Sequence, residues 1–347
     1  MDPLRELQKD FHLVFVNTIK WLSKKYDFVI SKDLGGSGFW ALGYDEGYDD
    51  LWFAVSGVVD ALTKASALAI NTERVRIGTA IIPVYTRTPA VLASTTRVLW
   101  ELSEGRFILG LGSSSQTMME NWNGQKFEKP LTRVKETTQL VKSILRGEKT
   151  DYSGETVKSR GYKQIPVKDG VQPVYMAALR PGMLEAAAEF SDGVILNLFP
   201  KEALPKMMEH IRIGAERAGK RLEDVEVVCR HQVVVTDDKE NSRNLIRAGF
   251  APYYATPVYN KFLAWCGYED VAESIRDGWA SKDRDKTTGA LTDKLVEDIA
   301  ILGSEEQCHD RIREYAEMGI TTHIISCVSP KDSQRTFQAF SGNKFSI

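Results

Sequence analysis

Hydrophobic residues along the chain alternate between short runs rich in β-branched side chains and longer segments with helical periodicity. Each apolar run is followed by a helical candidate. The runs that are typical of buried strands are 11–16, 38–42, 75–84, 106–111, 172–178, 193–198, 225–235 and 322–328. The pattern therefore predicts eight strand–helix units in a row.

Several predicted helices carry their own start and stop signals. Thr88 and Pro89 are the residue types preferred at an N-cap and first helical position, and Ser304 with Gln307 forms a capping-box pattern. Gly105 and Gly319 stand where the corresponding helices should end. The longest apolar stretch, 51–70, contains Asp60 and Lys64, which a bilayer core would penalise, so we expect a packed helix there.

Near-continuous apolar strands separated by helices indicate parallel strands that are buried on both faces. Eight such units close into a (β/α)₈ TIM barrel, which we expect as a single domain over 1–347. The segment from about 236 to 295 would be an insertion after the seventh strand, on the substrate side. A doubly wound open sheet is the alternative architecture.

The loops that follow the strands build the active site of such a barrel. After the fourth strand, "LGLGSSS" (109–115) offers small side chains, backbone N–H groups and hydroxyls that suit an anion. After the fifth, "ALRPGM" begins a helix at Pro181, and a helix N-terminus also attracts phosphate. Each loop has an ordinary explanation, a glycine-serine turn or a proline-started helix. The two together favour a phosphate-bearing cofactor.

Composition narrows the function by exclusion. The 45 basic and 47 acidic residues nearly balance, so the sequence offers no basic stripe for nucleic acid or an anionic membrane. Four separated cysteines predict neither a metal site nor a disulfide framework, and the N-terminus lacks a signal-peptide pattern, so we expect a cytoplasmic protein. Glycine-rich Rossmann and P-loop motifs are missing, which argues against dinucleotide binding and a Walker-type NTPase.

Three stretches carry a resemblance to a known family: "RIGTAIIPVYTRTPAVLASTTRVLWELSEGRFILGLGSSS", "FEKPLTRVKE" and "PVYMAALRPGMLEAAAEFSDGVILN". They resemble the luciferase-like monooxygenase superfamily, in particular the branch that uses the deazaflavin coenzyme F420, such as methylenetetrahydromethanopterin reductases. The resemblance implies a homodimeric, F420-dependent oxidoreductase that transfers a hydride to or from a small organic substrate. An FMN-dependent monooxygenase and a non-catalytic flavin-binding protein of the same fold are the alternatives.

The resemblance also implies where the cofactor would lie. The third strand of the family carries a bulge with a non-prolyl cis peptide bond behind the ring, which falls here at Ala80–Ile81. Small Thr79 and Ala80 would leave room for a flat ring. The cofactor tail would be lined by Gly112, Ser113 and Ser114, and its phosphate region by Ala177, Ala178, Gly182 and Met183.

The catalytic group is less clearly marked. Glu120 stands where related F420 enzymes present an acid near the ring, although a solvent-exposed loop carboxylate is the simpler reading. Many members of the family have an acid–histidine pair after the second strand, whereas this chain has "ALGYDEGYDD" (41–50) without histidine. Tyr44, Asp45 and Glu46 are the candidates to replace that pair, or else they are ordinary turn residues.

The roles of three further groups of residues are open. The segment 250–268 carries Tyr253, Tyr254 and Trp265, which suit an apolar or aromatic substrate but are also typical of a core or dimer interface. Arg133 is predicted to pair with Glu136 or Glu101 rather than with phosphate, and Arg87 stays open. His231, late in a strand, is a minor candidate for the site.

Overall fold

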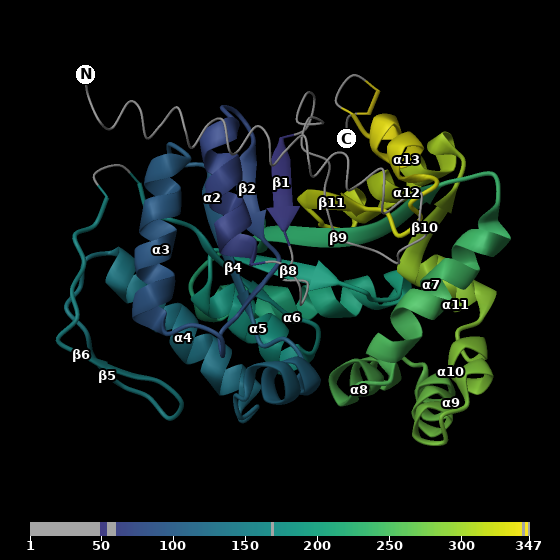
Figure 1. Ribbon diagram of the computed structural model, residues 1–347, viewed down its shortest axis with the longest axis horizontal. Helices are drawn as coiled ribbons and strands as arrows, with labels where there is room; N and C mark the ends of the chain where they lie inside the picture. Colours follow the sequence, from purple (N-terminus) through teal and green to yellow (C-terminus); the bar gives the residue numbers. More distant parts are fainter. Residues whose placement is uncertain (1–48, 54–59, 168–169, 342–343, 346–347) are drawn as a thin grey trace. The chain divides into compact units, whose positions relative to one another are not determined.

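The computed structural model describes residues 49–53, 60–167, 170–341 and 344–345 (Figure 1). The strands predicted at 11–16 and 38–42 lie outside these residues. The described strands are β1 Asp50–Phe53, β2 Arg76–Thr79, β3 Ile82–Pro83, β4 Phe107–Gly112, β5 Asp151–Ser153, β6 Lys158–Arg160, β7 Val174–Ala177, β8 Gly193–Asn197, β9 Glu226–Val235, β10 Ala300–Gly303 and β11 Thr322–Ser326.

Helices follow most of these strands. They are α2 Ala61–Asn71, α3 Pro89–Leu102, α4 Pro130–Leu145, α5 Pro181–Phe190, α6 Leu204–Arg217, α7 Lys239–Tyr254, α8 Pro257–Trp265, α9 Glu269–Ala280, α10 Arg284–Gly289, α11 Asp293–Ile299, α12 Glu305–Glu317 and α13 Ser333–Ala339. Three short helices complete the list: the π-helix η1 Met118–Trp122 and the 3₁₀ helices η2 Lys201–Ala203 and η3 Leu222–Asp224.

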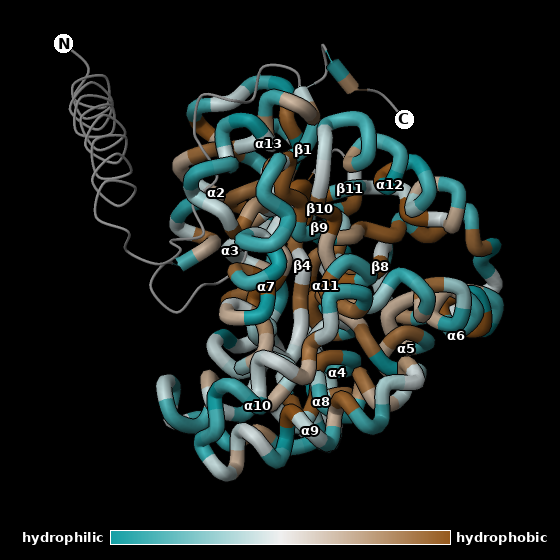
Figure 2. Tube along the Cα trace, turned by 90° about the vertical axis from the view of Figure 1, so that its right-hand side faces the viewer, coloured by the Kyte–Doolittle hydropathy of each residue, from teal (hydrophilic) through white to brown (hydrophobic). Residues whose placement is uncertain are grey.

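The main sheet is parallel and curves into a nearly closed barrel. Its strands are paired in the order β1-β2-β4-β7-β8-β9-β10, with β3 also on β4 and β11 also on β9. The last strand, β11, lies against the first, β1. Figure 2 shows the apolar strands enclosed by helices with more polar outer faces. The predicted (β/α)₈ barrel is therefore confirmed, and the open sheet is excluded.

Predicted helix signals are confirmed, but four of the described strands were missed: β1, β5, β6 and β10. Thr88 caps α3 with Pro89 in its first turn, and Ser304 with Gln307 forms the capping box of α12. The expectation of one helix over 51–70 was wrong, because its start is strand β1 and α2 begins only at Ala61. Strand β10 escaped prediction because it has four residues and directly follows α11. The exposed antiparallel hairpin β5–β6 was missed as well.

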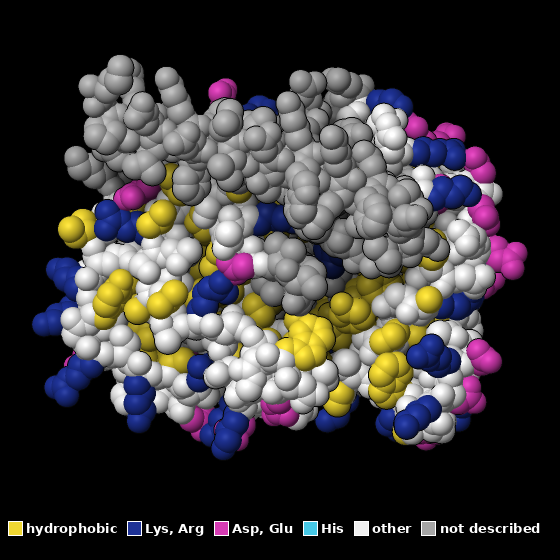
Figure 3. Space-filling model, viewed as in Figure 1, with side chains coloured by type: hydrophobic (Ala, Val, Ile, Leu, Met, Phe, Trp, Pro, Cys, Tyr) yellow, Lys and Arg dark blue, Asp and Glu magenta, His cyan; other side chains and the backbone are white. Residues whose placement is uncertain are grey.

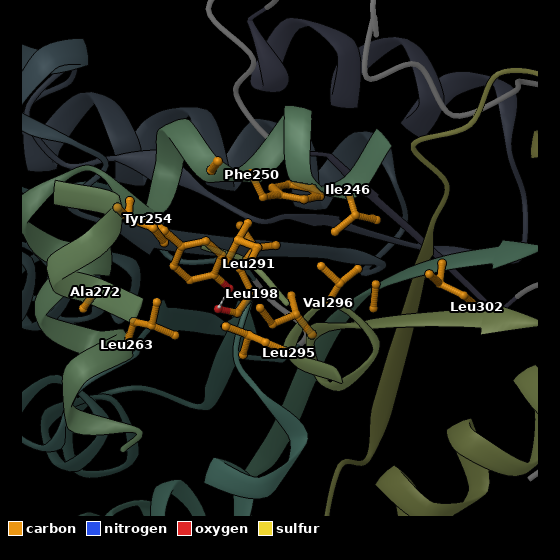
Figure 4. Packing of buried hydrophobic residues seen from close by; sticks show 14 of the residues in the cluster. Leu198, Ile246, Phe250, Tyr254, Leu263, Ala272, Leu291, Leu295, Val296 and Leu302 are labelled. Atoms are coloured by element: carbon orange, nitrogen blue, oxygen red, sulfur yellow. Dashed lines mark hydrogen bonds between the residues drawn. The ribbon is translucent and has the colours of Figure 1, made fainter. Parts of the chain in front are cut away.

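The predicted insertion is helical. Helices α7 to α11 lie between β9 and β10 and are grouped together in Figure 1. Their apolar faces form a core cluster, shown in Figure 4, that includes Ile246, Phe250 and Leu263. Tyr254 is fully buried in this cluster, and its hydroxyl donates to the carbonyl of Leu198 at 2.9 Å. The insertion is therefore fastened to the segment that leaves β8.

The surface is mixed in charge. On the uncovered part of the face in Figure 3, basic and acidic side chains are interspersed around the margin, with hydrophobic side chains between them. This distribution agrees with the nearly balanced formal charge of the sequence. Within the described ranges, no helix combines the length and the apolar character that a membrane crossing requires.

An ionic cluster joins the strands where they begin. Arg76 on β2 donates to Asp50 on β1 (Nη2 to Oδ2, 2.6 Å) and to Glu226 on β9 (Nη2 to Oε1, 2.9 Å). Glu226 also accepts from the hydroxyls of Tyr175 on β7 and Thr322 on β11. Burial alone would raise the pKa of Glu226, but the hydrogen bonds from these partners outweigh burial and lower it. Five strands are thus tied together through one carboxylate and one guanidinium.

We expect Arg76→Met to destabilise the protein by about 2–3 kcal/mol, because it leaves Asp50 and Glu226 inside the barrel without their cation. The loss should fall short of the roughly 3–5 kcal/mol of a fully buried pair, since the Arg76 side chain is 40% exposed. Urea unfolding of wild type and variant measures the difference. The matched control is Arg146→Met, which breaks an exposed pair with Glu148 and should cost at most about 1 kcal/mol. Equal losses in the two variants would contradict a bracing role for Arg76.

Candidate functional site

The ends of strands β3, β4 and β7 meet around one glycine. A Cβ added at Gly112 would lie 2.9 Å from the Ile81 side chain and 3.3 Å from the Cβ of Ala177. The peptide bond between Ala80 and Ile81 is cis, which confirms the bond that the family resemblance implies. Ala80, Ile81 and Ala177 are all half-buried. This end of the barrel therefore offers a small, apolar and partly accessible surface.

Backbone donors stand beside this surface. In the described part of the chain, the N–H groups of Ser113 and Ser114 donate no hydrogen bond, and Ser114 has a left-handed φ of 63°. Helix α5 begins nearby with Arg180 as N-cap, without a side-chain capping bond, and with Pro181 in its first turn. The N–H group of Gly182 likewise has no partner among the described residues. These donors suit an anionic group such as a phosphate.

Three of the predicted cofactor residues make hydrogen bonds within the fold. Thr79 is fully buried, and its hydroxyl accepts from the N–H of Gly110 at 2.8 Å and donates to the carbonyl of Gly110 at 3.1 Å. It clamps β2 to β4 at the point where β2 gives way to β3. Ala178 is buried, and its N–H donates to the carbonyl of Ile195 on β8. Met183 is half-buried in the first turn of α5, where its N–H donates to Arg180.

Glu120 lies in the π-helix η1 and is exposed. One carboxylate oxygen accepts from Nε2 of Gln116 at 2.9 Å, and the other accepts from the N–H of Phe127 at 3.2 Å. The carboxylate thereby holds the two ends of the loop after β4 together. Tyr44, Asp45 and Glu46, the other predicted polar residues, lie outside the described residues.

The aromatic candidates of the insertion separate into different environments. Tyr253 is 50% exposed and packs against Phe250 and Tyr259, so it can meet a ligand. Tyr254 is committed to the core through Leu198, as described above. Trp265 packs between Phe262 and His210. Its ring also lies under the ammonium group of Lys206 at 4.0 Å, so it serves the contact between α8 and α6.

The two arginines near the loops are occupied by protein groups. Arg133 donates to the carbonyl of Thr156 at 2.6 Å and lies over the ring of Tyr85. The expected pairing of Arg133 with Glu136 or Glu101 was wrong, because Glu136 accepts instead from the backbone of the β5–β6 hairpin. Arg87 pairs with Asp60, the N-cap of α2.

Sequence reasoning missed a group of polar residues inside the barrel, on strands β8, β9 and β11, away from Gly112. We call this group, Asn197, Arg230, Gln232 and Ser326, the polar wall. Register pairs Asn197 on β8 with Arg230 on β9, and Gln232 on β9 with Ser326 on β11. Glu226 reaches across the interior to Arg76, and every second residue after it on β9 lies on the same face of the strand. Arg230 and Gln232 therefore also belong to the interior face. The alternation of polar residues at 226, 230 and 232 was the available signal.

His231 is turned away from this interior. Its Nε2 lies 3.0 Å from Nδ1 of His323, the two rings are stacked, and Tyr315 of α12 packs against it at 4.6 Å between ring centroids. Burial, together with the neighbouring His323, lowers the pKa of His231 well below its usual range. Burial lowers the pKa of His323 to about 4. The pair belongs to the packing between barrel and helix rather than to the site.

The strands form a parallel barrel, and small residues and free N–H donors are concentrated at the ends of its strands. These features are typical of a TIM-barrel protein whose site is built by the βα loops. The model of the luciferase-like monooxygenase family matches residues 44–322, and the chain belongs to this family.

Three known proteins show how far the similarity extends. A 5,10-methylenetetrahydromethanopterin reductase of Methanolobus tindarius is 30% identical over 283 residues, which are 81% of this chain and 86% of the relative. The coenzyme F420-dependent tetrahydromethanopterin reductase of Methanopyrus kandleri has a similar structure, with a TM-score of 0.72, 22% identity, and coverage of 86% of this chain and 90% of that one. An F420-dependent secondary alcohol dehydrogenase, solved with an F420–acetone adduct, gives a TM-score of 0.68 at 16% identity and covers 85% and 89% of the two chains.

The buried histidine pair predicts a pH-dependent stability. A histidine whose folded pKa is depressed binds its proton more readily after unfolding, so stability falls as the pH drops from 6.5 toward 4. For His323 this amounts to about 3 kcal/mol between pH 7 and pH 4, by the conversion of 1.36 kcal/mol for each pKa unit. His323→Gln should remove this part of the acid sensitivity. Urea unfolding across that pH range measures it, and parallel loss of stability in wild type and variant would contradict the assignment.

Proposed function

We propose that this protein is a coenzyme F420-dependent oxidoreductase that transfers a hydride between the deazaflavin and a small organic substrate. Membership of the luciferase-like family supports the proposal, as does the 30% identity over 81% of the chain to a methylenetetrahydromethanopterin reductase. Both structurally similar proteins named above are described as F420-dependent. The observation in this structure that carries the proposal is the half-buried apolar surface of Ala80, Ile81 and Ala177, packed closely at Gly112, with backbone donors beside it.

The residues present fit such a group. A flat ring needs an apolar surface without protruding side chains, and Gly112, Ala80 and Ala177 provide small groups next to Ile81. A phosphate needs N–H donors and a helix N-terminus, and the groups of Ser113, Ser114 and Gly182 provide them. When bound, the deazaflavin would supply the hydride chemistry. The protein would supply its position and its electrostatic surroundings.

Each part of the chain then has a task. The side chain of Ile81 supports the ring from the strand side, and the loop 113–114 and the start of α5 fix the charged tail. Tyr253, on the accessible side of the insertion, contacts the substrate. Glu120 holds or accepts a proton close to the reacting atoms, while Tyr44, Asp45 and Glu46 remain predicted to orient the substrate. A homodimer in the cytoplasm also remains a prediction from the family resemblance.

The first test is a titration of the purified protein with F420 and FMN side by side, followed by absorbance and fluorescence. We expect F420 to bind and FMN to bind at least tenfold more weakly. Gly112→Val should abolish F420 binding, because its side chain displaces Ile81 into the space for the ring. The matched control is Gly249→Val, since a Cβ at Gly249 meets no atom within 4 Å.

Circular dichroism establishes that both valine variants are folded. Tighter binding of FMN than of F420 would replace the proposal with a flavin enzyme of the same fold. Binding of neither cofactor would favour a protein without redox function. A folded Gly112→Val variant with wild-type affinity for F420 would show that the cofactor is placed wrongly.

Glu120→Gln tests the proton-transfer role. The substitution keeps the shape of the side chain and its acceptor for the Phe127 N–H, but it removes the acid. A positioned acid or base contributes about 10²–10⁴-fold, so turnover should fall by that order while F420 affinity stays the same. Oxidation or reduction of F420 with a panel of alcohols, aldehydes and enones provides the assay. Unchanged turnover would leave Glu120 with its loop-bracing role alone.

A further inference from the structure

The polar wall of the barrel contains an arginine without a counter-ion. Arg230 is half-buried on the interior face of β9, and its Nη2 donates to Oγ of Ser326 at 3.0 Å. Among the described residues, no carboxylate lies within ion-pairing distance of its guanidinium, which has five N–H donors. The phenols of Tyr253 and Tyr259 are its other electrostatic neighbours, and burial lowers its pKa. A cation in such surroundings is costly unless an anion joins it.

The neighbouring amides are also unsatisfied. Gln232 is 1% exposed, and in the described structure neither its Nε2 nor its Oε1 has a hydrogen-bond partner. Oδ1 of Asn197, the register partner of Arg230, is likewise buried without a partner. Buried polar groups are rarely left unpaired in folded proteins, because each costs about 1–3 kcal/mol. Several such groups on one interior wall point to a ligand that satisfies them.

The charge and the shape of the polar wall limit the chemical class of ligand that it can bind. Arg230 is a single cation, and its remaining neighbours Gln232 and Ser326 are neutral hydrogen-bonding groups. One cation with neutral donors matches a group of one negative charge, and a planar guanidinium fork matches a carboxylate. A dianionic phosphate would keep an uncompensated charge here.

The wall is separate from the proposed cofactor seat. Gly112 is on β4 and Arg230 is on β9, with β7 and β8 between them in the sheet. Three strand spacings correspond to about 14 Å along the barrel wall. A molecule held at Arg230 can therefore occupy the mouth of the barrel together with a ring at Gly112.

We propose that Arg230, Gln232 and Ser326 form a subsite for the carboxylate of the substrate, so that the enzyme acts on a small organic acid. The statement that the bound acid is the substrate rests on the proposed function. The subsite itself is argued from the residues of this chain alone. Tyr253 and Tyr259, which interact electrostatically with the guanidinium and pack against each other, would contact the apolar part of the acid.

The test uses benzoate as the carboxylate probe and benzamide as its neutral analogue, measured by calorimetry with the F420-loaded and the cofactor-free protein. Benzoate should bind both forms and benzamide neither. In Arg230→Met, benzoate affinity should fall by about 10–100-fold, as expected for a hydrogen bond to a charged group, and F420 affinity should stay within about twofold of the wild-type value. Arg87→Met, which removes an arginine already paired with Asp60, should leave both affinities unchanged.

A second readout separates a binding role from a structural one. Removal of an unpaired charge should leave the melting temperature of Arg230→Met equal to or above that of wild type, whereas a bracing role would lower it and overturn the inference. If that variant does not fold, Gln232→Leu provides the test, and it should weaken the binding of benzoate about tenfold or more.

Three other results would refute the subsite: equal binding of benzamide, stronger binding of inorganic phosphate than of benzoate, and loss of F420 affinity in Arg230→Met. The last would assign Arg230 to the cofactor. Failure of F420 to bind wild type would refute the proposed function instead, because benzoate binding to the cofactor-free protein is measured independently.

Discussion

The pairing of Arg76 with Glu226 holds the barrel together where its strands begin. The two residues are 150 positions apart in the chain, and their partners Asp50, Tyr175 and Thr322 come from three further strands. Parallel strands that are tied at one end leave the other end to the loops. The polar groups of the ionic cluster satisfy one another, whereas at the loop end several buried polar groups, such as those of Gln232, are left without partners among the described residues.

The loop end is divided into two walls of different character. Ile81 and Ala177 present a half-buried apolar surface that packs closely at the buried Gly112 and has backbone donors beside it, whereas Arg230 and Gln232 on the other side are polar and under-satisfied. The insertion is joined to the polar wall, because Tyr254 fixes the left-handed Leu198 next to Asn197, and Tyr253 interacts electrostatically with the guanidinium of Arg230. Under the proposed function, the helical insertion would belong to the site as well as to the fold.

Local sequence patterns predicted most of the helices and strands, and the family resemblance predicted which residues would line the cofactor. Apolar runs and caps such as Thr88–Pro89 are short-range signals, and the structure confirms them. The strand β1 was absorbed into a helix because a buried strand and a buried helix share the same apolar composition over a few residues. Contacts between distant residues carried no such signal: neither Arg76 with Glu226 nor Thr79 with Gly110 follows from spacing along the chain. Arg230 was missed although polar residues recur at alternate positions 226, 230 and 232 of β9, and the register of β9 shows which strand residues lie beside it.

A crystal structure of the protein grown with F420 tests the central claim most directly. The account predicts the deazaflavin ring in van der Waals contact with Ile81 and Ala177 over Gly112, with the phosphate within hydrogen-bonding distance of the N–H groups of Ser113, Ser114 or Gly182. Arg230 should then remain open to the solvent or to a second molecule in the mouth of the barrel. Electron density for the ring anywhere else, or a cofactor phosphate on Arg230, would contradict the account.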